Sequence, residues 1–169
     1  MNWLTILIYF TIFLYGIVIG SFINVCIYRI PLKEDIVKER SHCMSCGHVL
    51  QWYELIPIVS YLVQKGKCRN CGTKLSVQYP LIEGTNGVLY VLIAVINGLN
   101  VDSLLYCLLI SALIALSVID WRTYEIPIGI NVFILALGLI MTVLHYEDWF
   151  NHVIGFFAVS IFIYIIILA

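Results

Sequence analysis

The sequence has 169 residues, of which 62% are hydrophobic and only 11% are charged, with a net charge of −1. Its mean hydropathy is +1.01. Soluble domains carry roughly 25% charged residues, so this composition excludes an ordinary soluble domain and predicts a membrane protein.

Five charge-poor runs are long enough, or nearly so, to cross a bilayer, which takes about 20 residues of helix. They cover residues 1–28, 75–101, 103–119, 126–146 and 149–169. No positive residue precedes the first run and no small-residue cleavage site follows it, so we expect a membrane span there rather than a signal peptide. The sequence therefore predicts an all-α, polytopic membrane protein with about five transmembrane helices.

The basic residues predict how these helices are oriented. Eight of the nine lie between the first two runs, and the ninth is Arg122. Short cytoplasmic loops collect Lys and Arg, so the segment 31–79 is predicted to face the cytoplasm, with the N-terminus outside. Counting spans then places Asp120 at the cytoplasmic face. The loop 145–152 falls outside, as its acidic residues and lack of basic ones would suggest.

The segment 31–79 is the part of the sequence suited to a soluble domain, and at this size a hydrophobic core rarely suffices without metals or disulfides. It contains two copies of Cys-x-x-Cys-Gly-x-x-Leu, beginning at Cys43 and Cys68. Two residues between thiolates let one tight turn present both sulfurs to one ion, and Gly47 and Gly72 permit the positive φ that such turns require. The pattern predicts a structural zinc ion bound by Cys43, Cys46, Cys68 and Cys71.

Alternatives to this zinc site stay open from the residues alone. Disulfide bonds are disfavoured by the predicted cytoplasmic location, because that compartment is reducing. Redox chemistry at one Cys-x-x-Cys leaves the duplication unexplained. His42 and His48 flank the first pair and could replace a thiolate, although four cysteines already complete a tetrahedral site. Cys26 and Cys107, in the apolar runs, are predicted to pack as small apolar residues.

Two further features lie in or beside the predicted spans. Gly16 and Gly20 have the small-x-x-x-small spacing that lets another helix approach closely, so we expect a helix contact there. The stretch 50–63, between the cysteine pairs, is apolar enough to pack on the bilayer surface or on the zinc-binding module. It contains no glycine-rich phosphate loop.

Two carboxylates lie at predicted membrane depth, where an ionisable residue is by default a functional-site hypothesis. Asp120 follows the third run, a few residues before Pro127 opens the next, and is expected at the edge of the lipid. Either it belongs to a site or it reaches headgroup water and pairs with Arg122. Pro80 favours the start of a helix, which places Glu83 in its first turn. There the helix dipole favours an anion, and a role in cofactor binding is the other interpretation.

Together these motifs resemble the family of type IV prepilin leader peptidases, bifunctional membrane enzymes of pilus, type II secretion and competence systems. As a set the motifs are highly specific, and they follow the family's order along almost the whole chain. They are Gly20-Ser-Phe-Ile-Asn-Val with Tyr28-Arg-Ile-Pro31, the paired Cys-x-x-Cys-Gly turns, Ile56-Pro-Ile-Val-Ser-Tyr61, Gln78-Tyr-Pro-Leu-Ile-Glu83, and Asp120 followed by Ile126-Pro127.

The resemblance implies an aspartic protease of the bacterial inner membrane that cuts the leader from prepilins and pseudopilins at the cytoplasmic face. It also implies methylation of the new N-terminal residue with S-adenosylmethionine. Pilin-like precursors and membrane lipid are the expected partners, without nucleic acid. Asp120 matches the first of the family's two catalytic aspartates. The second belongs to a Gly-x-Gly-Asp motif in a later span, and this sequence contains no such motif.

Aspartic proteolysis needs two carboxylates that share a proton. Glu83, Glu125 and Asp148 are the candidates to replace the second aspartate. Asp148 is predicted on the opposite face of the membrane, and neither Glu83 nor Glu125 has the family's sequence context. We therefore expect a first transmembrane helix in residues 1–30, a cytoplasmic zinc-binding domain in 31–79 and an incomplete peptidase core in 80–169. The alternative is a catalytically silent membrane module whose zinc domain binds prepilin or assembly proteins.

Overall fold

The computed structural model describes residues 2–168, with the backbone alone at 159, 160 and 162–168. The α-helices in that range are α1 (Trp3–Leu32), α2 (Val59–Val63), α3 (Gln78–Asn97), α4 (Val101–Thr123), α5 (Ile128–Leu144) and α6 (Trp149–Leu168). Single 3₁₀ turns cover Trp52–Glu54 and Tyr146–Asp148. The described chain is thus helical outside its loops, as the sequence predicts.

Among the residues that the structure describes in full, three helices, α1, α3 and α4, are long and apolar enough to cross a membrane. The segments Ile128–Leu144 and Tyr146–Ala158 also pass as a pair, but they are bent by 102° at the break between them. The structure therefore supports three candidate spans, or four if the bent pair is one, where the sequence predicts about five. The charge-poor runs mark α5 and α6 correctly as helices, but composition does not reveal the sharp bend that joins them.

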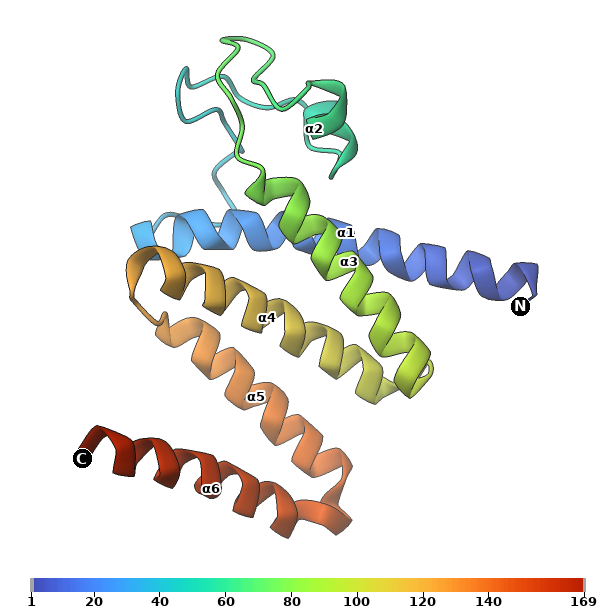
Figure 1. Cartoon of the computed structure of the whole chain (residues 1–169), viewed down its shortest axis with the longest axis vertical. Helices are drawn as coiled ribbons and strands as arrows, with labels where there is room; N and C mark the ends of the chain where they lie inside the picture. The colour runs from blue at the N-terminus through green and yellow to red at the C-terminus, as the bar shows by residue number, and fades with distance from the viewer. Residues whose placement is uncertain (1, 169) are drawn as a thin grey trace.

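α1 and α3 pack so closely that only glycine fits on α1 at the crossing. A Cβ added to Gly16 would lie 2.6 Å from the Cα of Gly87, and one added to Gly20 would lie 2.7 Å from the Cα of Glu83. Figure 1 shows α3 crossing α1, with α4 below α1 and its start beside the end of α3. The predicted contact at the glycine pair is confirmed.

A buried polar network fastens α1, α3 and α4 to one another. Asn86 is fully buried and donates from Nδ2 to the Gly16 carbonyl at 2.7 Å. The Ser111 hydroxyl of α4 donates to Asn86 Oδ1 at 3.0 Å, and it lies 2.9 Å from the Tyr90 hydroxyl. Because lipid offers no hydrogen bonds, polar groups inside the helix assembly have to satisfy one another in this way. Beside the network lies an apolar core of Ile23, Ile27, Ile82, Ala112, Ala115, Ile119 and Ile130.

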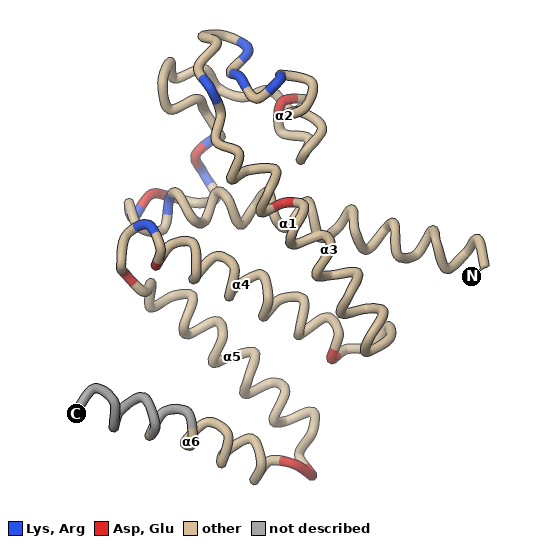
Figure 2. The backbone as a smooth tube through the Cα atoms, viewed as in Figure 1, with Lys and Arg blue, Asp and Glu red and all other residues tan. Residues whose placement is uncertain are grey.

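The segment between α1 and α3 forms a small module beside the C-terminal end of α1 (Figure 1). Arg29, in the last turn of α1, donates from Nη1 to the carbonyls of Asp35 at 3.1 Å and Glu39 at 2.9 Å, which folds the departing chain back onto the helix. Figure 2 shows the basic residues gathered on this module and on the neighbouring ends of α1 and α4. This asymmetry is the basis of the predicted topology.

Candidate metal centre and adjoining cavity

The two cysteine turns fold alike. In each, the N–H of the first cysteine donates to the carbonyl five residues later, and the glycine N–H donates back to the carbonyl of that cysteine, all at 2.8–2.9 Å. Gly47 and Gly72 have φ of +69° and +72°, as the sequence predicts. With no Cβ, glycine adopts this conformation without steric cost. Each turn therefore holds its two thiols on one side of a tight loop.

The two turns bring four sulfur atoms together. These atoms lie within 4.8 Å of one another, and they belong to Cys43, Cys46, Cys68 and Cys71. Cys43 Sγ and Cys71 Sγ are 3.9 Å apart, close to the roughly 3.8 Å between sulfurs that tetrahedral Zn–S bonds of about 2.3 Å require. All six cysteines of the chain are free thiols. The geometry thus suits a four-thiolate metal site and gives no support to disulfides.

At Cys43 and Cys71 the surroundings favour the thiolate form that binds metals, whereas desolvation, together with hydrogen bonds with the side chains of Cys43 and Cys71, raises the pKa of Cys68. Hydrogen bonds with the side chain and backbone of Thr73 lower the pKa of the Cys71 thiol to about 6. A hydrogen bond from the backbone N–H of Ser45 lowers the pKa of Cys43.

Glu54, which the sequence analysis did not single out, supports the first cysteine turn. Its side chain is buried, and Oε2 accepts a hydrogen bond from the Gln51 N–H at 2.9 Å and lies 3.1 Å from His48 Nε2. The Gln51 N–H and the neighbouring His48 lower the pKa of this carboxyl. His48 therefore contacts Glu54 rather than replacing a thiolate. The signal in the sequence is the spacing Gln51-x-x-Glu54, which is typical of a capping box.

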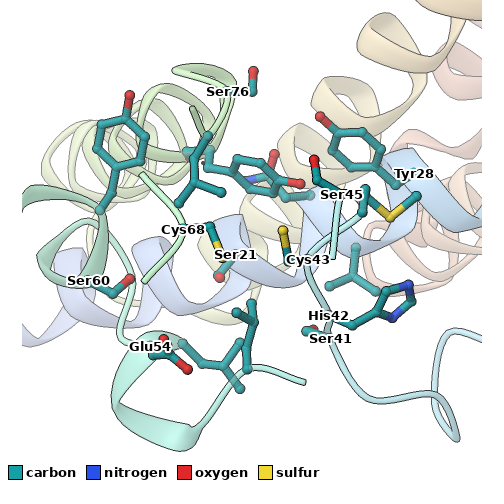
Figure 3. A pocket seen from close by; sticks show the side chains of 18 of the residues that line it. Ser21, Tyr28, Ser41, His42, Cys43, Ser45, Glu54, Ser60, Cys68 and Ser76 are labelled. Carbon is teal, nitrogen blue, oxygen red and sulfur yellow. Dashed lines mark hydrogen bonds between the residues drawn. The ribbon is translucent and has the colours of Figure 1, made fainter. Parts of the chain in front are cut away.

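A cavity of about 320 Å³ lies between the cysteine cluster and the helices α1 and α3. Its wall includes the two buried cysteines of the cluster, Cys43 and Cys68, and from the helices Asn24, Tyr79 and Glu83. Figure 3 shows the sulfurs of Cys43 and Cys68 beside the same space, with Ser21, Glu54 and Ser60 around it. The cysteine cluster and the helix assembly therefore share one recess.

Glu83 connects α3 to the metal-binding module. α3 begins at Gln78, two residues before Pro80, so Glu83 lies in the second turn of the helix. The prediction that Glu83 lies in the first turn is therefore wrong. The residue is 5% exposed, and its Oε2 accepts a hydrogen bond from the Ile58 N–H at 2.7 Å. Ile58 has φ +61° and ψ −51°, and the Val59 N–H donates to the Pro57 carbonyl at 2.6 Å, which defines a strained γ-turn. Strained backbone of this kind clusters at ligand sites.

Asp120 lies in the last turn of α4, outside the cavity wall. Its side chain is exposed and, within the described part of the chain, makes no hydrogen bond or ion pair. Arg122 does not pair with it. Instead Arg122 Nη2 donates to the Tyr28 hydroxyl at 3.2 Å, and its Cζ lies 4.3 Å from the centre of that ring. Tyr28 stacks on Tyr79 at 5.6 Å, and both line the cavity. A three-residue stack thus links the helix end that carries Asp120 to the cavity.

Fold and site together define a polytopic helical membrane protein with a four-cysteine metal-type site. The profile of the bacterial peptidase A24 N-terminal domain matches residues 14–97, which include both cysteine pairs and Glu83. The "Prepilin leader peptidase/N-methyltransferase" of Myxococcus xanthus (strain DK1622) is 41% identical over 125 residues, covering 73% of this chain and 37% of that protein. The chain belongs to this family, and the resemblance seen in the sequence is confirmed.

Other relatives with the same name extend the match. The protein of Bacillus subtilis (strain 168) is 33% identical over 156 residues, covering 92% of this chain and 63% of that protein. The protein of Neisseria gonorrhoeae is 36% identical over 149 residues, with coverages of 74% and 52%. The chain thus spans between 37% and 63% of the length of these three relatives. No solved structure matches it.

Proposed function

We propose that this chain takes part in the processing of prepilins and pseudopilins at the cytoplasmic face of the bacterial inner membrane. It removes the leader by aspartic proteolysis and supports N-methylation of the new N-terminus with S-adenosylmethionine. The names of the relatives support these two activities. The concentration of basic residues on the metal-binding module supports its cytoplasmic orientation.

In this proposal the four cysteines hold a structural zinc ion. The spacing of the sulfurs and the lowered pKa values of Cys43 and Cys71 fit that ion. When bound, zinc would cross-link the two turns of a segment too small to fold on a hydrophobic core alone. It would also fix Cys43 and Cys68 as one wall of the cavity.

The observation that carries the proposal is the Arg122–Tyr28–Tyr79 stack. It joins the end of α4, where Asp120 lies exposed, to the cavity that contains Glu83. A pilin N-terminus released beside Asp120 would therefore reach the cavity without leaving this face of the protein. Glu83, a buried carboxylate in the cavity wall, is our candidate for binding the methyl donor, because a buried carboxylate pairs strongly with a cationic group.

In leader cleavage Asp120 would act as the base that removes a proton from the attacking water. A second carboxyl group has to remain protonated and donate to the developing oxyanion, which one ionised carboxylate cannot do. The sequence contains no Gly-x-Gly-Asp motif, so we propose that the second group comes from outside these 169 residues.

The test co-expresses the chain with the remaining spans of a homologous peptidase and follows cleavage of a prepilin. Asp120→Asn should abolish cleavage. Asp102→Asn is the matched control, because Asp102 lies in the first turn of the same helix, and it should retain activity. Retained cleavage by Asp120→Asn would refute the assignment. If the wild-type combination binds prepilin without cutting it, the alternative of a silent binding module gains support.

A further inference from the structure

The apolar stretch 50–63 leaves several of its large side chains exposed instead of packing them on the metal-binding module. Trp52 is 76% exposed, Leu62 is 66% exposed and Val63 is 76% exposed. On α2 the polar side of the helix faces inward, because Ser60 and Tyr61 line the cavity. Polar residues inside and apolar residues outside are the reverse of a helix that faces water. The outward, apolar side of α2 is therefore suited to a lipid environment.

α2 is also placed at the depth where a bilayer surface would lie. Ile58, which precedes it, donates to Glu83, and its Cδ1 lies 4.0 Å from the position of a Cβ on Gly84. Glu83 in turn packs against Gly20 of α1. From Trp3 to Gly20 α1 rises about 26 Å at 1.5 Å per residue, close to the roughly 30 Å of a hydrocarbon core. Figure 1 accordingly shows α2 beside α1 and the start of α3, not beyond the end of α1.

The charges next to this apolar surface match an anionic lipid headgroup layer. Lys65, Lys67 and Arg69 directly follow α2 and are exposed. Trp52 precedes it, and tryptophan is enriched at membrane–water interfaces. Cytoplasmic leaflets attract such basic clusters. Apolar side chains at interfacial depth with basic residues beside them are the pattern of an interfacial membrane anchor.

We propose that Trp52, Val59, Leu62 and Val63 insert into the headgroup–acyl boundary of the membrane that α1, α3 and α4 cross. Lys65 and Lys67 contact anionic phospholipid headgroups. The metal-binding module is then held by the bilayer as well as by α1 and α3, the helices on either side of it in the chain. This contact with the bilayer also keeps the γ-turn at Ile58 next to Glu83. This inference depends on the membrane spans and is independent of the proposed catalytic roles.

The test places the photo-crosslinking residue p-benzoylphenylalanine at position 62 in the full chain, reconstituted in vesicles of phosphatidylethanolamine and phosphatidylglycerol. The matched control carries it at position 37, because Val37 is an apolar residue of the same module and is 82% exposed. Mass spectrometry should find phospholipid adducts at position 62 and none at position 37. Adducts to protein alone at 62, or equal lipid adducts at both positions, would overturn the proposal.

A second comparison tests the headgroup charge. The double variant Lys65→Glu/Lys67→Glu should lose lipid adducts at position 62 in the anionic vesicles, whereas Lys33→Glu/Lys38→Glu, exposed lysines of the same module, should keep them. Metal content and circular dichroism establish that each variant is folded. Adduct yields that stay the same without phosphatidylglycerol would overturn the proposed contact with anionic headgroups.

Discussion

Gly16 shows how one missing side chain sets the helix arrangement. Its absent Cβ would meet the Gly87 backbone at 2.6 Å, and neither helix can yield without moving the other. We expect Gly16→Val to lower the free energy of unfolding by about 1–3 kcal/mol, the usual range for overpacking, measured by thermal unfolding in detergent. Gly138→Val is the control, since nothing lies within 4 Å of a Cβ there. Equal losses in both variants would show that the glycine crossing is not a close contact.

Asn86 contributes to the stability of the helix assembly through buried hydrogen bonds, which water cannot replace because the residue is fully buried. It joins the Gly16 carbonyl and the Ser111 hydroxyl, so Asn86→Ala leaves both without that partner in a buried setting. The expected loss of stability is on the order of 1 kcal/mol, as for other hydrogen bonds between membrane helices. Asn97→Ala, on the same helix, removes only an exposed contact with the Ile93 carbonyl and should be nearly neutral. A larger loss at Asn97 than at Asn86 would contradict the role of the network.

At the scale of elements, the metal-binding module should depend on its ion, whereas the helix assembly should not. The purified chain is expected to contain one zinc per molecule, and Cys43→Ser should lose it. Hydrogen exchange should then rise across residues 41–75 while α1, α3 and α4 stay protected, because their contacts involve no metal ligand. Cys107→Ser, a buried cysteine of α4, is the control. Metal-free Cys43→Ser protein with an unchanged exchange pattern would show that zinc does not order the module.

The sequence predicts those elements whose geometry is set by local spacing. The glycines after each cysteine pair, the helix crossing at Gly16 and Gly20, and the helical nature of the apolar runs all follow from patterns within a few residues. The roles of Glu54, Asn86 and Ile58 depend instead on partners brought near by folding. Glu83 shows both cases. The sequence predicts a carboxylate near the start of the second apolar run, whereas its burial and its hydrogen bond from the Ile58 N–H, 25 residues away in the chain, depend on partners brought near by folding.

At the scale of the whole molecule, the chain combines an exposed carboxylate at the end of α4 with a cavity lined by Cys43, Cys68 and Glu83. Arg122 stacks on Tyr28 and so links the two regions, while Asp120 itself stays outside the cavity wall. We therefore expect two separable activities, with Asp120 serving leader cleavage and Glu83 serving methyl transfer. The substitution Glu83→Gln keeps an acceptor oxygen for the Ile58 N–H and so preserves the local fold.

The most direct measurement follows both reactions in one enzyme, the chain co-expressed with the remaining spans of a homologous peptidase. Cleavage is measured with a prepilin, and methylation is measured with already cleaved pilin and labelled S-adenosylmethionine. Asp120→Asn should lose cleavage and still methylate pilin that is supplied already cut. Glu83→Gln should cleave the prepilin and fail to transfer the label. Loss of both reactions in either folded, zinc-loaded variant, or methylation unchanged by Glu83→Gln, would contradict the separation of the two sites.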